Sequence, residues 1–185
     1  MPLARFFARR RSRDNAAHDL YVGAVEQARR PDLYLRYGIA DTVDGRFDLL
    51  TAHAFLLMRR LGGIAGARAG EAKVLSQALF DLMFADMDQN LREIGVSDMS
   101  IGKKVKQMAR AFYGRVAAYD SGFQREGEAL AEAVARNLYR GSPPSAEAAP
   151  AFAAYLRRQA GHLAGQGDDA LLAGRVSWLA EEGTP

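Results

Sequence analysis

An amphipathic helix pair over residues 74–119 is the feature that most constrains the fold. In its first segment, 74–95, apolar residues recur at helical spacing around roughly half of the helix. This arc consists of Leu75, Leu79, Phe80, Leu82, Met83, Phe84, Met87, Leu91 and Ile94. So wide an arc needs several neighbouring helices to cover it. The pair therefore predicts a helical bundle.

Two polar residues, Asp86 and Asn90, fall inside this apolar arc. A carboxylate in or near a core must find a cation or several hydrogen-bond donors, because burying an unpaired charge is costly. The sequence therefore predicts a buried or half-buried ion pair at Asp86 that sets the register of the helices. Its candidate cations are Lys104, Arg110, Arg115, Arg46 and Arg60. On the solvent side, Asp88 and Arg92 have the i, i+4 spacing of an ordinary helical ion pair.

The second segment of the pair, 101–119, is apolar on one face and basic on the other. Its candidate partner-binding residues are Lys103, Lys106 and Arg110, flanked by Lys104, Tyr113 and Arg115. A basic helix face is most often simply solvated, and this alternative stays open. If the face does bind, its complementary partners are an anionic lipid surface, ribosomal RNA or an acidic protein.

The rest of the chain suits one helical domain. Its 185 residues are of single-domain length, and 49% of them are apolar. No stretch shows the alternation of a strand. We expect an all-α, single-domain bundle of about seven helices over residues 15–185. The expected elements beyond the pair are helices at 15–30, 44–61, 124–139, 150–164 and 168–182, a helical turn at 32–38, and a flexible glycine-rich connection at 62–72.

Residues 1–14 form a basic segment that we expect to be a flexible tail. Its arginines are interleaved with aromatic residues, and the first acid is Asp14. A segment of this kind contacts anionic membrane or RNA phosphates, or is simply solvated. The candidate contact residues are Arg5, Phe6, Phe7, Arg9, Arg10, Arg11 and Arg13.

Neither a catalytic nor a metal site is predicted. The chain has no cysteine, which excludes thiol nucleophiles and cysteine-ligated metals. The three histidines, His18, His53 and His162, lie on separate expected helices and lack metal-ligand spacing. His53 lies among leucines, so we interpret it as a satisfied structural histidine. We expect no enzyme activity and no cofactor.

Three stretches resemble the ubiquinol–cytochrome c chaperone family. They are ARRPDLYLRYGIADTVDGRFDLLTAHAFLLMRRL, SQALFDLMFADMDQNLREIGVSDMSIGKKVKQMARAFYGRVAAYD and RNLYRG. The likeness extends over roughly residues 16–180 and is most specific from Gln77 to Tyr119. The resemblance implies a polar motif that is structural in part. Its members in this chain are Asp44, Arg46, Asp48, Asp86, Asn90 and Arg92.

The same resemblance implies a function. It predicts a non-enzymatic, α-helical assembly chaperone for ubiquinol–cytochrome c reductase (complex III). The expected partner is newly made cytochrome b or another complex III subunit, with the ribosome as a further partner. The short form resembles a bacterial member, so we expect a cytoplasmic protein, with peripheral contact to the inner face of the cytoplasmic membrane as an option.

Two other function classes stay open from the sequence. One is a peripheral membrane-surface or RNA-binding module that acts through the basic tail and the basic helix face. The other is a helical metalloenzyme that uses aspartates and histidines, and it has the least support. The sequence does not indicate which surface contacts a client.

Overall fold

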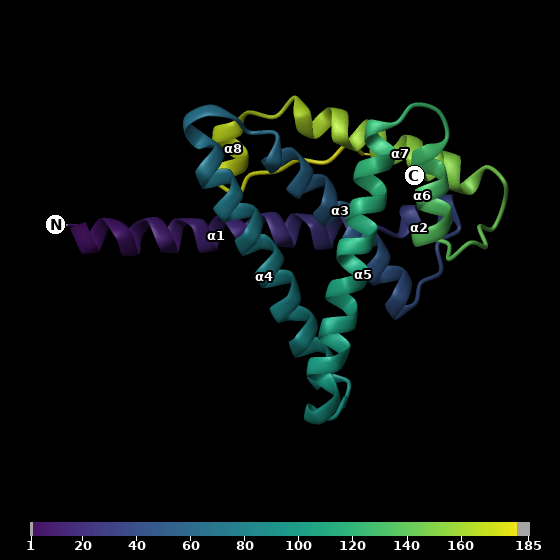
Figure 1. Cartoon of the computed structure of the whole chain (residues 1–185), viewed down its shortest axis with the longest axis horizontal. Coiled ribbons are helices and arrows are strands. Elements are labelled where there is room, and N and C mark those ends of the chain that lie inside the picture. Colours follow the sequence, from purple (N-terminus) through teal and green to yellow (C-terminus); the bar gives the residue numbers. More distant parts are fainter. Residues whose placement is uncertain (1, 181–185) are drawn as a thin grey trace.

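The computed structural model describes the backbone of residues 2–180 and the side chains of residues 11–180. Within these residues every regular element is helical, which confirms the expected all-α class (Figure 1). The elements are α1 (Pro2–Ala28), α2 (Pro31–Tyr37), α3 (Val43–Gly62), the 3-10 turn η1 (Gly66–Arg68), α4 (Ala69–Glu93), α5 (Asp98–Gln124), α6 (Ala129–Asn137), α7 (Ala148–Ala164) and α8 (Asp168–Leu172).

Helix α3 is the centre of the bundle. It packs against α1, α4, α5 and α7, and most of its residues are buried. Its start follows from the sequence, because the Thr42 hydroxyl accepts a hydrogen bond from the Gly45 N–H at 3.1 Å, as an N-cap residue does. Thr42 is therefore the N-cap residue of α3. Because α3 contacts four helices, it fixes the direction in which the hairpin formed by α4 and α5 leaves the body.

The expected helix pair is confirmed as the α4–α5 hairpin. Its two helices start apart in the body and converge on a turn at 94–97, away from the other elements (Figure 1). Gly95 has a φ of 83°, the left-handed conformation that glycine adopts freely at the end of a helix. The inner half of the hairpin packs against α1 and α3, whereas its outer half projects from the bundle.

Several helix bounds differ from the prediction. Helix α1 begins at Pro2 and not near Asn15, so it covers most of the expected tail. Whether residues 1–14 move independently of the domain stays a prediction. The stretch 62–72 holds a 3-10 turn and the start of α4, so it is not one glycine-rich connection. Helix α6 begins later than expected, at Ala129, because α5 continues to Gln124.

The expected helix at 168–182 is wrong for residues 173–180, and its last two residues lie outside the described part of the chain. The chain turns at Gly174, where φ is 82°, and continues without helix to residue 180. A Cβ at Gly174 would lie 2.8 Å from the Ala16 Cα on α1, so only glycine allows this approach. No helix in the described part of the chain is long and apolar enough to cross a membrane.

Candidate partner-binding surface

One face of α5 carries exposed residues of two kinds. Met99, Lys103, Lys106, Arg110 and Tyr113 are spaced at i, i+4, i+7, i+11 and i+14, so they lie along one side of the helix. All five are exposed, with Met99 97% and Tyr113 56% accessible. We call them the α5 stripe. A cationic centre with an apolar residue at one end and an aromatic residue at the other can bind a surface that is both anionic and apolar.

The cations of the stripe have no carboxylate partner among the residues that the structure describes. No acid occurs on α5 between Asp98 and Asp120, and none from the other described elements comes within ion-pair distance of Lys103, Lys106 or Arg110. Lys104 is also exposed but lies off the stripe, about 100° around the helix from Lys103. The positive charge is therefore available to an external anion.

An aromatic cluster supports the inner end of the stripe. The ring of Tyr113 lies 5.2 Å from that of Phe80, which lies 4.6 Å from Phe84 and 5.5 Å from Phe112. Phe112 and Phe84 are buried, Phe80 is half-buried and Tyr113 reaches the surface. The cluster ties α4 to α5 and presents one aromatic ring to solvent, so Tyr113 is held in place before any partner binds.

The outer end of the hairpin exposes apolar side chains. Ile94 is 69% accessible, although its place on the apolar arc predicts burial. On α4 the last buried residue is Met87, because the outer turns have only α5 beside them. Together with Met99, Ile94 forms an apolar tip at the far end of the α5 stripe.

Arg115 lies apart from the exposed α5 stripe, and its role in partner binding stays a prediction. Its side chain is turned inward, where Nη2 lies 2.7 Å from the Asp48 Oδ1 on α3. Asp48 is fully buried. The Arg140 Nη2 lies 3.4 Å from the Asp48 Oδ2 and 3.1 Å from the Asp44 Oδ2. These four residues form an ion cluster that joins α5, α3 and the loop after α6.

Burial dominates the electrostatics of this cluster. It raises the pKa of Asp48 to about 6, while Arg115 and Arg140 oppose the rise by favouring the carboxylate. The carboxylate is therefore ionised at neutral pH and stabilised by its two arginines. The ion pair expected at Asp86 is present in this protein, but at Asp48.

Asp86 itself makes no ion pair with any described residue, so that prediction is wrong. Its carboxylate lies on an exposed part of α4, where Oδ2 accepts hydrogen bonds from the Tyr21 hydroxyl at 2.6 Å and the Asn90 side chain at 3.0 Å. Tyr21 is buried on α1. Burial, followed by this hydrogen bond to Asp86, raises the pKa of the tyrosine above its ordinary value. Asp86 therefore joins α4 to α1 without a cation.

The remaining polar-motif residues make local contacts. Arg92 pairs with Asp88 at 2.7 Å, as expected, and also with Asp98 at 2.6 Å across the hairpin turn. Arg46 pairs with Asp41 at 2.7 Å on the surface before α3. These ion pairs are exposed and contribute little to stability. Within the described side chains no group of three acids and histidines could hold a metal ion.

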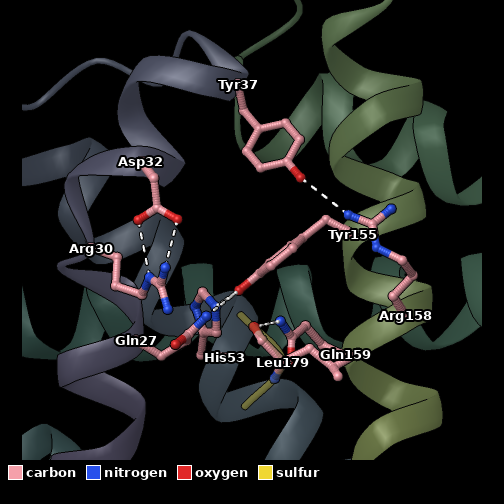
Figure 2. Close-up of polar contacts among 9 residues, drawn as sticks. All are labelled: Gln27, Arg30, Asp32, Tyr37, His53, Tyr155, Arg158, Gln159 and Leu179. Atoms are coloured by element: carbon pink, nitrogen blue, oxygen red, sulfur yellow. Dashed lines mark hydrogen bonds and ion pairs between the residues drawn. The ribbon is translucent and has the colours of Figure 1, made fainter. Parts of the chain in front are cut away.

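A buried hydrogen-bond network surrounds His53 (Figure 2). The His53 Nδ1 lies 2.8 Å from the Leu49 carbonyl, and Nε2 lies 2.6 Å from the Tyr155 hydroxyl. Because a carbonyl only accepts, Nδ1 carries the proton and Nε2 accepts from Tyr155, whose oxygen accepts from Gln27 at 3.1 Å. This confirms the structural role of His53. Tyr155 and Gln27 were missed because nothing in their local sequence marks them as partners.

Of the candidate contact residues in the basic tail, only Arg11 and Arg13 have described side chains. Arg13 is paired with Asp14 at 2.6 Å, whereas Arg11 is exposed. Arg5, Phe6, Phe7, Arg9 and Arg10 lie outside the described side chains. Contact of this segment with membrane or RNA stays a prediction.

A family model described as ubiquinol-cytochrome C chaperone matches residues 35–178. The chain belongs to the ubiquinol–cytochrome c chaperone family. The matched range includes the whole α4–α5 hairpin, the ion cluster at Asp48 and, from the network around His53, every residue except Gln27. The family consists of assembly factors for ubiquinol–cytochrome c reductase and not of enzymes.

Relatives and a solved structure of this chaperone family agree with the assignment. The human "Ubiquinol-cytochrome c reductase complex assembly factor 1" is 27% identical over 88% of this chain and 54% of its own length, and the Xenopus laevis protein is 25% identical over 88% and 80%. The chain thus spans about half the length of the human relative. The crystal structure of the Cbp3 homolog from Brucella abortus has 31% identity and a TM-score of 0.82, with 97% of each chain covered.

Proposed function

We propose that this chain is a non-enzymatic assembly chaperone for complex III that binds newly made cytochrome b through the α5 stripe and the apolar tip of the hairpin. The observation that carries the proposal is the α5 stripe. Its three cations have no carboxylate partner in the described chain, and they lie between exposed Met99 and Tyr113 on a hairpin that projects from the bundle.

The chemistry of the stripe suits such a client. A membrane subunit that has not yet assembled exposes apolar segments, and its polar loops and ends carry charges. The apolar tip can cover an apolar segment, while the cations bind acidic groups next to it. The names of the human and frog relatives support complex III assembly as the process in which this chain acts.

The first test is genetic. Deletion of the gene should lower the amount of assembled complex III while the transcripts of its subunits persist. Re-expression of the wild-type chain should restore the complex. Unchanged complex III in the deletion strain would overturn the proposal.

The second test locates the contact. A photo-crosslinking amino acid placed at Lys106 or Tyr113 should capture cytochrome b, whereas the same group at Arg125 or Arg136, which are exposed elsewhere on the body, should not. The triple change Lys103→Glu, Lys106→Glu and Arg110→Glu should weaken capture at Met99 by at least tenfold. Equal capture at the control positions would refute the stripe as the client surface.

The same triple variant distinguishes cytochrome b from the alternative partners. If the stripe contacts an anionic membrane or ribosomal RNA instead, the triple variant and the wild-type chain should capture cytochrome b to the same extent. The triple variant instead loses salt-sensitive binding to anionic vesicles or to ribosomes.

A further inference from the structure

After α8 the chain crosses the bundle in extended form, and two glutamines hold its backbone. Gln166 donates to the Ser177 carbonyl at 2.8 Å and accepts from the Ser177 N–H at 3.0 Å. Gln159, on α7, does the same with Leu179, at 2.9 Å and 3.0 Å (Figure 2). Each side-chain amide thus bonds both backbone groups of one residue, and the two bound residues are two apart, as along the edge of a β-sheet.

The side chains on either side of Ser177, those of Val176 and Trp178, lie against a floor made by two other helices. On α1, Gly23 leaves a notch: a Cβ there would lie 2.9 Å from Val176 Cγ1 and 3.8 Å from Trp178 Nε1. On α3, the buried His53 ring meets the Trp178 ring edge-on with centroids 5.2 Å apart. We call residues 175–180 the strap, and we call Gly23, His53, Gln159 and Gln166 the strap groove.

Peptide-binding grooves hold extended strands by the same two kinds of contact. Main-chain hydrogen bonds supply binding energy without reading sequence, and pockets for alternate side chains supply the preference. Here the preference is for an aliphatic residue followed, two positions later, by an aromatic one. We propose that the strap groove is a binding site for an extended peptide of this pattern and that the strap is its removable intramolecular ligand.

The floor of the groove is held by contacts that do not involve the strap. His53 is held by Leu49 and Tyr155, and Gly23 and Gln159 lie within the regular helices α1 and α7. The strap has no regular secondary structure, and its backbone bonds at 177 and 179 are made with side chains. When it leaves, the side-chain amides of Gln159 and Gln166 become free to bond another backbone.

The intact wild-type chain can report the exchange, because Trp178 is its only tryptophan. The probe is a synthetic peptide of residues 175–180 that carries Trp178→Phe and therefore does not fluoresce as tryptophan. Titration should shift the Trp178 emission to longer wavelength and saturate, because the peptide displaces the strap into water. A tethered strap competes at a high effective concentration, so saturation needs millimolar peptide.

Two full-length variants sharpen the test. Trp178→Ala weakens the strap, so this chain should bind a fluorescein-labelled wild-type strap peptide at least tenfold more tightly than the wild-type chain does. Adding Gln159→Ala to the same chain should remove that gain. A strap peptide with Val176→Asp is the matched control and should not bind. A folded Trp178→Ala chain that binds the wild-type peptide no better than the wild-type chain does would overturn the proposal.

Native-state hydrogen exchange decides the matter without any substitution. If the strap is removable, the Ser177 and Leu179 amides should exchange at least a hundredfold faster than buried amides in the middle of α3, and the strap peptide should leave the α3 rates unchanged. Exchange of Ser177 and Leu179 at the rate of global unfolding would show that the strap is a fixed part of the fold and would overturn the proposal.

Discussion

The body of the bundle and the outer half of the hairpin differ in how their polar side chains are buried and paired. In the body, Asp48 and His53 are buried and each is held by named partners on other helices. On the outer hairpin, the cations of the α5 stripe are solvated and unpaired within the described chain, beside exposed Met99. The difference separates residues that maintain the fold from residues that are available to a partner, although both sets lie partly on one helix, α5.

The largest effect on stability is expected at Arg115, and it tests this difference between the body and the hairpin. Arg115→Ala leaves the buried Asp48 carboxylate with only the longer contact to Arg140, and it should lower the free energy of unfolding by about 3–5 kcal/mol. Urea denaturation measures the loss. Arg110→Ala, a little more than one turn earlier on α5, is the matched control and should change stability by less than about 0.5 kcal/mol. Similar losses for both arginines would contradict the division between body and hairpin.

The next effect concerns pH and His53. Burial lowers its pKa from 6.5 to about 4, so between these values the unfolded chain is protonated on this ring and the folded chain is not. The stabilisation from the neutral ring is complete above pH 6.5 and is lost as the pH falls towards 4. Its size is about 3 kcal/mol.

Asp48 acts with the opposite sign over nearly the same window. Its raised pKa of about 6 makes the folded chain take up a proton first, so its contribution grows as the pH falls from 6 towards 4. The two groups offset one another in the wild type. In His53→Gln only the Asp48 contribution remains. Relative to the wild type, this variant should gain about 3 kcal/mol between pH 6.5 and 4, measured by urea unfolding at each pH. Parallel profiles would refute the account.

A smaller effect is expected where α1 meets α4. Tyr21→Phe removes the hydrogen bond to Asp86 but keeps the ring, and Asp86 remains accessible to water. The loss should therefore be only about 1 kcal/mol by thermal or urea denaturation. A loss as large as that of Arg115→Ala would mean that Asp86 is buried in solution.

The smallest effect is expected at the tip of the hairpin. Met99→Ser should change stability by less than about 0.5 kcal/mol, because the side chain is almost fully accessible. Met83→Ala, at a buried methionine of the same hairpin, should cost about 2–5 kcal/mol. Under the proposed function, Met99→Ser should still reduce capture of cytochrome b. Loss of stability at Met99 would show that the tip is covered in solution.

The sequence predicts the helices better than it predicts which of their side chains are buried by neighbouring helices. Periodicity identified the α4–α5 hairpin, and the neighbouring leucines indicated the structural role of His53, because each depends on residues close in the chain. Which part of an apolar arc is covered depends on tertiary neighbours. Ile94 continues the arc of α4 but has no helix over it, whereas Asp48 is buried because α5 brings Arg115 to it.

Part of the candidate site was predictable for the same reason. The exposure of Lys103, Lys106, Arg110 and Tyr113 follows from their spacing on α5, so the stripe could be found from the sequence. Arg115 could not be separated from them, because a difference of one or two positions decides whether a side chain turns inward. The strap was also missed, since a local pattern favours continuing α8, while a contact with Ala16 on α1 decides the turn at Gly174.

The uninterrupted helix α5 has a mechanical consequence. It runs from Asp98 to Gln124, so Met99 lies about 24 Å along the helix from Arg115, one of the residues that attach α5 to the body. A rotation of about 5° about that attachment would move the tip by about 2 Å. A client that pulls on the tip therefore loads the Asp48–Arg115 ion pair together with the packing of the inner half of the hairpin, and these contacts set how far the hairpin can yield.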